Sequence, residues 1–137
     1  KPVLWSTVEK TALADAEVEY LDHISNTIYV AFKVKETGKD FLKNSSIIIW
    51  TTTPWTIPAN KALAYNSNID YSLLEINELE NFKDKKIVVA TNLIDSIIKD
   101  CEIKKFKVLK TFKGSDFVGT ICSHPFLKMD FDYDCCF

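Results

Sequence analysis

The chain has 137 residues, of which 47% are hydrophobic and 26% are charged, proportions typical of a soluble globular protein with a single hydrophobic core. Its formal net charge is −2 and all 17 basic residues are Lys, which excludes a broad positive surface or arginine forks for gripping a long nucleic-acid duplex. No apolar run reaches the ~20 residues of a membrane-spanning helix, and the first residues carry no signal peptide. We therefore expect a cytoplasmic protein that would meet RNA only at a short single-stranded end.

The cysteines do not predict a disulfide framework. Cys135 and Cys136 are adjacent, and no secretory segment accompanies Cys101 and Cys122, so we expect free thiols in a reducing compartment. Adjacent cysteines rarely give tetrahedral ligand geometry, so no metal site is expected. Cys122 and His124 would share one face of a strand, where a nucleophilic pair is one interpretation. A buried cysteine followed by a turn-forming His-Pro is the interpretation we favour.

Most of the chain has the hydrophobic patterns of β-strands. Apolar and polar side chains alternate over 28–35, which predicts a half-buried strand. The continuous apolar run over 47–50 predicts a strand that is buried on both faces. The same criteria predict further strands over 71–76, 87–90, 106–112 and 117–122.

Short helices are expected among these strands. Thr91 can cap a helix that runs through Lys99, where apolar residues recur at helical spacing. Thr56 can cap a short helical turn that has Pro58 near its start. The prediction is a mixed α/β fold that is mostly β, with a few short helices and a single domain over 1–137.

The segment 50–60, Trp-Thr-Thr-Thr-Pro-Trp-Thr-Ile-Pro-Ala-Asn, is the strongest candidate for chemistry. A strand delivers consecutive hydroxyls to a turn that the two prolines force. Strand alternation sends Thr51 and Thr53 to one face and Thr52 to the other. Each hydroxyl donates one hydrogen bond and accepts two, so the cluster can hold a water, an ester carbonyl and a ribose hydroxyl without a strong nucleophile.

Three more side chains in this segment are candidates for ligand contact. Trp50 and Trp55 flank the threonines and offer a stacking face for a base or an apolar wall for a small side chain. Asn60 lies one short turn later and can donate and accept hydrogen bonds together. A purely structural interpretation remains, in which threonines form the strand, tryptophans fill the core and prolines make the bend.

The same segment resembles the threonine-rich signature of the editing domain of bacterial-type isoleucyl-tRNA synthetases. Valyl and leucyl relatives typically have Arg in place of the third threonine and an acidic residue in place of Trp55. Thr53-Pro54-Trp55 therefore favours the isoleucyl branch.

The resemblance extends over nearly the whole chain. Residues 1–6 and 11–20 resemble the passage from the family's catalytic core into the inserted editing domain, and we expect 1–16 to form that passage. Residues 114–126 resemble the stretch that precedes the second half of the editing pocket. The implied fold is a barrel-like editing domain.

The resemblance implies double-sieve proofreading, for which this family is itself the standard example. The synthetic pocket rejects valine poorly, because valine is only one methylene smaller than isoleucine. A second, smaller site excludes isoleucine and hydrolyses the ester that joins valine to the terminal adenosine of tRNA(Ile). By resemblance, the catalytic residues are Thr52, Thr53 and Asn60. The residues expected to bind substrate are Trp50, Thr51, Thr52, Thr53, Trp55 and Asn60.

The resemblance also implies partners and cofactors. The expected partners are the 3′ end of tRNA(Ile) carrying valine and the rest of a parent synthetase, which we expect to be a monomer without a membrane anchor. No cofactor or metal is expected in this segment, whereas the parent should use ATP and Mg²⁺ and can carry zinc elsewhere. The absence of an initiator Met and the last residue, Phe137, suggest a piece of a longer protein.

One departure from the family pattern bears on activity. The family completes its pocket with a later Gly-Thr-Gly segment and an acidic block that binds the substrate's α-ammonium group. Asp132 and Asp134 do not match that block, so we expect the chain alone to hydrolyse mischarged tRNA weakly or not at all. The alternative function is a non-catalytic, β-rich module that binds a single-stranded RNA 3′ end or a nucleotide by tryptophan stacking.

Overall fold

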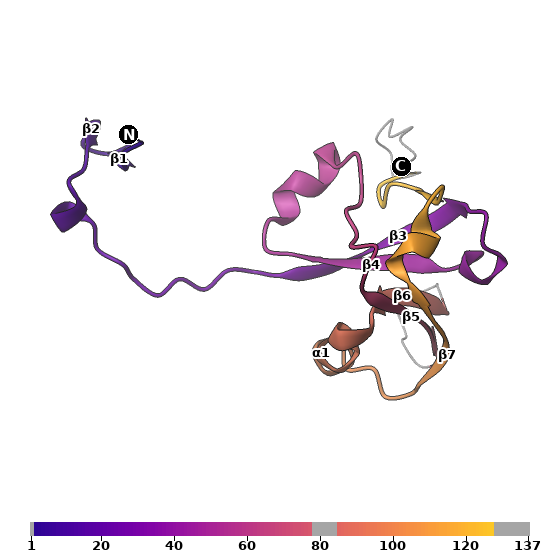
Figure 1. Cartoon of the computed structure of the whole chain (residues 1–137). Helices are drawn as coiled ribbons and strands as arrows, with labels where there is room; N and C mark the ends of the chain where they lie inside the picture. The colour runs from indigo at the N-terminus through magenta and orange to yellow at the C-terminus, as the bar shows by residue number, and fades with distance from the viewer. Residues whose placement is uncertain (1, 78–84, 128–137) are drawn as a thin grey trace.

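A computed structural model describes residues 2–77 and 85–127 of the chain (Figure 1). The strands in this part are β1 (Trp5–Ser6), β2 (Thr11–Ala12), β3 (Ile28–Glu36), β4 (Ser46–Thr51), β5 (Asp70–Ile76), β6 (Lys86–Ala90), β7 (Phe106–Lys113) and β8 (Ile121–Cys122). The α-helix α1 spans Ile94–Asp100. The 3₁₀ helices are η1 (Asp15–Glu17), η2 (Asp40–Leu42), η3 (Pro54–Ala59), η4 (Thr91–Leu93) and η5 (Gly114–Phe117).

Strands β3 to β8 form one mixed sheet in the order β7-β5-β6-β4-β3-β8. Every neighbouring pair is antiparallel except β4 and β6, which run parallel. The predicted mixed, mostly β fold with few short helices is therefore confirmed. The described strands nevertheless leave the sheet open, with β7 and β8 at its edges, and they do not close into a barrel. β8 contributes only 2 residues, which is too short an edge to join the sheet into a cylinder.

Helix α1 covers one face of the sheet (Figure 1). Strand alternation brings apolar side chains of β5 and β6 onto this face, where they pack with the helix. The buried members of this cluster are Leu74, Ile76, Ile87, Val89, Ile97 and Ile103. At its border the Tyr29 hydroxyl donates to the Asp100 carboxylate at 2.8 Å, which links β3 to the end of α1. That hydrogen bond, with burial and the nearby negative charge adding, raises the pKa of Tyr29 to about 12.

The opposite face is covered by the short 3₁₀ helices and by aromatic rings. Two buried clusters lie there, comprising Leu42, Leu73, Val88, Phe112 and Phe117 in one and Phe32, Val34 and Cys122 in the other. The Phe112 and Phe117 rings meet edge to face with their centroids 5.3 Å apart, one of the arrangements that aromatic pairs prefer. Ile47 packs against both clusters and so joins them across β4.

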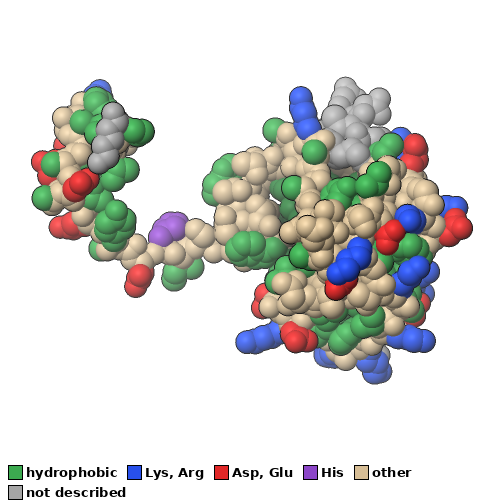
Figure 2. Space-filling model, in the orientation of Figure 1, with side chains coloured by type: hydrophobic (Ala, Val, Ile, Leu, Met, Phe, Trp, Pro, Cys, Tyr) green, Lys and Arg blue, Asp and Glu red, His purple; other side chains and the backbone are tan. Residues whose placement is uncertain are grey.

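Residues 2–27 form an arm that runs away from the sheet (Figure 1). The small antiparallel ribbon of β1 and β2 lies near its end. Hydrophobic side chains are distributed along the arm (Figure 2), and Tyr20, Leu21 and Ile24 are 90%, 85% and 96% exposed.

Local patterns predicted most strands correctly and two features incorrectly. The strands expected over 28–35, 71–76, 87–90 and 106–112 are confirmed as β3, β5, β6 and β7. The strand expected over 117–122 is wrong, because Phe117 turns into the core within η5 and only Ile121–Cys122 pairs with β3. Ile47, Ile48 and Ile49 are half-buried, so β4 is not a strand buried on both faces.

The two predicted helical segments exist, but their caps differ from prediction. The Thr91 side chain does not cap a helix; its hydroxyl lies 2.9 Å from that of Ser72. Thr56 lies inside η3 rather than at its start, because Pro54 already occupies the first turn. Within the described residues, no helix combines the length and the apolar character needed to cross a lipid bilayer.

Gly114, at the start of η5, supplies a test of the packing. A Cβ at this position would overlap the backbone oxygen of Asn66 and lie 3.0 Å from the Tyr71 ring. We expect Gly114→Ala to lower the free energy of unfolding by about 1–3 kcal/mol, because a backbone oxygen cannot move aside as a flexible side chain does. Gly38→Ala is the matched control, since no atom lies within 4 Å of its Cβ position. Urea unfolding of the two variants should separate them, and equal midpoints would contradict this packing.

Candidate functional site

The threonine-rich segment leaves the sheet at the carboxyl end of β4. Thr51 is the last strand residue and pairs with Ile28 of β3, and η3 begins three residues later at Pro54. Proline has a fixed φ and no N–H, so it suits the first turn of a helix and cannot continue the strand ladder. The threonines at 51–53 therefore occupy the junction between strand and turn.

The hydroxyls of Thr51, Thr53 and Thr56 form a chain along this junction. The Thr51 and Thr53 oxygens lie 3.2 Å apart, and the Thr53 N–H donates to the Thr51 oxygen at 3.1 Å. The Thr53 and Thr56 oxygens lie 3.5 Å apart, and the Thr56 hydroxyl donates to the Thr53 carbonyl at 2.7 Å. Thr51 and Thr53 thus share a face, as strand alternation predicts, while Thr56 holds the turn from within.

A count of protons shows what this hydroxyl chain can offer a ligand. Each hydroxyl has one proton, and Thr56 uses its own on the Thr53 carbonyl. The Thr53 hydroxyl can then donate to Thr56, which leaves the Thr51 proton for a neighbouring molecule. Thr52 is exposed, and its hydroxyl makes no hydrogen bond within the part of the chain that the structure describes. The junction can therefore present two hydroxyl donors together with several acceptor lone pairs.

Trp50 and Trp55, the tryptophans of this segment, lie outside the core. Trp50 pairs with Tyr29 across β3 and β4, so it projects onto the α1 face while Thr51 projects onto the other. Trp50 is 55% exposed and Trp55, in η3, is 74% exposed. The interpretation that tryptophans fill the core at this position is therefore wrong. The structure does not bring Trp50 beside the Thr51–Thr53 pair, and both rings stand available to a ligand.

Asn60 follows η3 directly, and it shares a hydrogen-bond acceptor, the Ile57 carbonyl, with His124. Its N–H donates to the Ile57 carbonyl at 3.0 Å, and its side-chain amide donates to the Ala62 carbonyl at 3.2 Å. The ring Nε2 of His124 lies 2.8 Å from the same Ile57 oxygen. Sequence reasoning missed this role for His124, because no pattern of spacing links residues that are 67 positions apart.

The structure supports the interpretation of Cys122 as a buried cysteine and does not support a nucleophilic Cys122–His124 pair. Burial raises the pKa of the Cys122 thiol to about 11, so the thiolate that would attack is scarce at neutral pH. Cys101, at the end of α1, is also a free thiol whose pKa is raised by burial and by the neighbouring Asp100 carboxylate. Neither described cysteine is set up as a nucleophile.

The described residues contain no group of three or more His, Cys, Asp or Glu side chains placed to hold a metal ion. Cys135, Cys136, Asp132 and Asp134 lie outside the described residues. The chemistry available at the junction is therefore that of hydroxyls, one amide and backbone groups.

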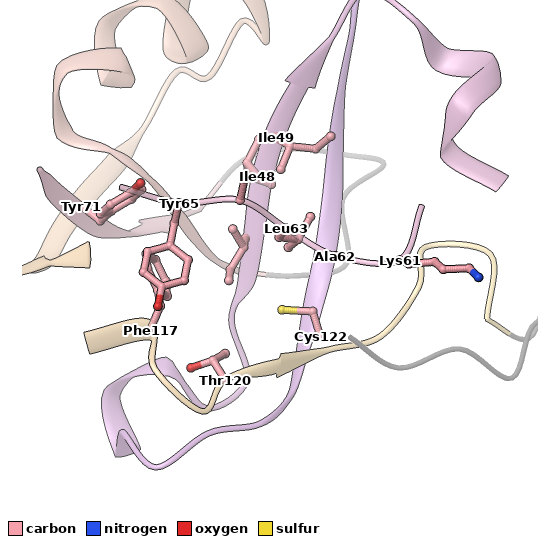
Figure 3. Close-up of a pocket in the computed structure, with 12 residues that line it drawn as sticks. Ile48, Ile49, Lys61, Ala62, Leu63, Tyr65, Tyr71, Phe117, Thr120 and Cys122 are labelled. Carbon is pink, nitrogen blue, oxygen red and sulfur yellow. The ribbon is translucent and has the colours of Figure 1, made fainter. Parts of the chain in front are cut away.

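A cavity of about 230 Å³ begins where this segment ends (Figure 3). Residues 61–65 cross over the sheet and form one side, Ile48 and Ile49 line it from β4, and Cys122 lies near Leu63 (Figure 3). The threonines at 51–53 do not line it. Its mostly aliphatic and aromatic lining suits an apolar group better than a charged one.

No protein-family model matches this chain, but curated relatives do. The isoleucine–tRNA ligase of Pelagibacter ubique is 67% identical over 134 residues, which cover 98% of this chain and 15% of that protein. The isoleucine–tRNA ligase of Caulobacter vibrioides is 41% identical over 97% of this chain, and that of Bacillus cytotoxicus is 44% identical over 95% of it. The matches cover 14% of each of these two proteins.

The chain thus spans about 15% of the length of the curated relatives it matches. The matched region takes in almost every residue, so it includes both the sheet and the threonine-rich junction. The family indicated by the resemblance of that junction is confirmed. The chain belongs to the isoleucine–tRNA ligase family and corresponds to one segment of these larger enzymes.

Proposed function

We propose that this chain contributes part of a post-transfer editing site, which hydrolyses the ester of mischarged Val-tRNA(Ile) in an isoleucine–tRNA ligase. The observation that carries the proposal is the hydroxyl chain of Thr51, Thr53 and Thr56 beside the exposed hydroxyl of Thr52. Hydrolysis by water needs donors for the carbonyl oxygen and acceptors for the protons of the water. Threonine hydroxyls supply both.

The proposed reaction needs no covalent intermediate. A water oxygen attacks the carbonyl carbon of the aminoacyl ester, and the bond from that carbon to the ribose oxygen breaks. The ribose oxygen takes up the proton that the attacking water loses, so the products are free valine, whose carboxyl group then ionises, and tRNA with an intact terminal hydroxyl. The Thr51–Thr53 pair holds the attacking water, with Thr51 donating to it and the Thr53 oxygen accepting from it, and the exposed Thr52 hydroxyl donates to the carbonyl oxygen. The hydroxyls act by position, since an unactivated threonine is a weak nucleophile.

The remaining candidate residues bind the rest of the substrate in this proposal. Trp50 and Trp55 present exposed rings to the terminal adenosine and to the pocket wall, and Asn60 presents its amide oxygen. The partner is the 3′ end of tRNA(Ile), in keeping with the names of the relatives. The parent enzyme would work in the cytoplasm as a monomer, with ATP and Mg²⁺ used outside this segment.

The exposed arm supports the proposal that this chain works as one segment of a larger protein. Tyr20, Leu21 and Ile24 are almost fully solvated, and we propose that the rest of the parent synthetase covers them. Residues 1–16 would then form the connection to the catalytic core, with 1–137 as part of one inserted domain.

A second function, nucleotide or RNA-end binding without chemistry, is favoured by the exposure of Trp50 and Trp55. A crystal soaked with a non-hydrolysable valyl-adenosine analogue separates the two. For the editing site we expect the valyl group to contact Thr51, Thr52 or Thr53. Stacking of the adenosine on a tryptophan with the valyl group in solvent would support the binding module instead.

Replacement of the Thr52 hydroxyl in the intact ligase tests the chemistry. We expect Thr52→Val to slow single-turnover hydrolysis of Val-tRNA(Ile) about tenfold or more, because a hydrogen bond to the transition state of ~1.4 kcal/mol is lost. Thr52→Ser is the matched control, since it keeps the hydroxyl and should stay within about threefold of wild type. Isoleucylation should be unchanged in both variants. Equal hydrolysis by all three enzymes would remove Thr52 from the site.

The isolated chain supplies a separate prediction. We expect the 137-residue chain to hydrolyse Val-tRNA(Ile) far more slowly than the intact ligase, because it spans about 15% of the relatives' length and leaves its arm uncovered. Deacylation of radiolabelled Val-tRNA(Ile) at equal molar concentrations of chain and ligase measures the difference. A rate equal to that of the ligase would show that the pocket is complete within this chain.

A further inference from the structure

His124 connects the threonine-rich turn to the far end of the chain. It lies in the segment that follows β8, next to Ser123, whose N–H donates to the Lys33 carbonyl of β3 at 2.8 Å. The imidazole reaches from there to the Ile57 carbonyl of η3 at 2.8 Å. A residue anchored to the sheet thus bonds the backbone of the turn that follows the threonines.

The hydrogen bonds of the ring assign its tautomer. The Phe126 N–H donates to Nδ1 of His124 at 3.1 Å, so that nitrogen must carry a lone pair. The Ile57 carbonyl can only accept, so Nε2 must carry the proton and donate to it. The imidazole is therefore neutral, with both ring nitrogens used in opposite directions. Of the common side chains, few can accept from one backbone group and donate to another in this way.

The ring is fixed by packing as well as by hydrogen bonds. His124 is 2% exposed, and its ring lies edge to face with Phe32 at 6.4 Å and with Phe126 at 5.3 Å. Ile57 is 5% exposed, so the bond between them is made away from water. Loss of a buried partner leaves a polar group unsatisfied, which costs more than loss of the same bond at the surface.

The same Ile57 oxygen also accepts the Asn60 N–H at 3.0 Å. His124 and Asn60 therefore meet at one oxygen within η3, three residues before Asn60, the residue proposed to bind substrate. The start of η3 is held by the Thr56 hydroxyl on the Thr53 carbonyl. We propose that His124 is a positioning residue for editing: its Nε2–H holds η3 so that Asn60 and the Thr51–Thr53 hydroxyls keep their arrangement around the ester. This inference rests on the function proposed above.

The test uses the intact ligase with three substitutions at one position. His124→Phe keeps an aromatic ring and loses both hydrogen bonds. His124→Gln keeps an amide N–H near the position of Nε2, and His124→Asn keeps only an acceptor near Nδ1. We expect the single-turnover rate of Val-tRNA(Ile) hydrolysis to fall about tenfold in the Phe and Asn variants and to recover to within about threefold in the Gln variant. The tRNA concentration at half-maximal rate should change less than about twofold, and isoleucylation should not change.

Hydrogen exchange supplies a readout that does not depend on activity. Backbone deuterium uptake over 50–60 should increase in His124→Phe and stay near wild type in His124→Gln. Ile97→Ala, in the cluster under α1, is the control for a general loss of stability. If Ile97→Ala slows hydrolysis as much as His124→Phe at a comparable loss of thermal stability, His124 acts only through the stability of the core.

Failure of this inference can be told apart from failure of the proposed function. Normal editing and normal exchange in His124→Phe, with slow editing in Thr52→Val, would overturn the role of His124 and leave the editing site in place. Normal editing in both Thr52→Val and Thr53→Val would overturn the proposed function itself. Increased exchange over 50–60 in His124→Phe would still show that the ring holds the turn, but without slower hydrolysis it would contradict a role in editing.

Discussion

The carbonyl group of Ile57 is the point on which the arrangement of the candidate site depends. It accepts the N–H of Asn60 and the Nε2–H of His124, so one buried oxygen joins the threonine-rich turn to a segment that is anchored on β3. Pro54 ends the strand and starts η3, but a proline sets only the local direction of the chain. The bond to His124 ties η3 to a segment anchored on the sheet, and we propose that this contact sets how the hydroxyls at the end of β4 face a ligand.

The sheet determines which side chains can act together. Thr51 projects from β4 on the face that carries Ile47 and Ile49, while Trp50 projects on the face covered by α1. A substrate that contacts both must therefore bind at the end of the sheet, where the faces meet and where Thr52 and Trp55 are exposed. The end of a strand followed by a rigid turn is a suitable place for such a site, because the strand fixes the hydroxyls while the turn leaves them open to solvent.

Local sequence patterns predicted the parts of this structure that depend on neighbouring residues. Period-2 alternation placed β3 and put Thr51 with Thr53, and the prolines marked η3. Apart from the misplaced cap at Thr56, which has a local cause in Pro54, the main errors involve long-range contacts. Phe117 leaves the expected strand because its ring packs on Phe112, and the sheet stays open because its edge strands do not pair. The bond of His124 to Ile57 joins residues 67 positions apart, so no local rule could reveal it. The face on which Trp50 projects likewise depends on the register of β3 against β4.

The central claim is that the hydroxyl chain at the end of β4 positions the water that hydrolyses mischarged tRNA. Its middle member is Thr53, within 3.2 Å of the Thr51 oxygen and 3.5 Å of the Thr56 oxygen. The most direct measurement is the accumulation of Val-tRNA(Ile) by the intact ligase with Thr53→Val, in the presence of valine and ATP. We expect valylated tRNA to accumulate with this variant while wild type keeps it near background. Equal, low levels of Val-tRNA(Ile) with both enzymes would contradict the claim.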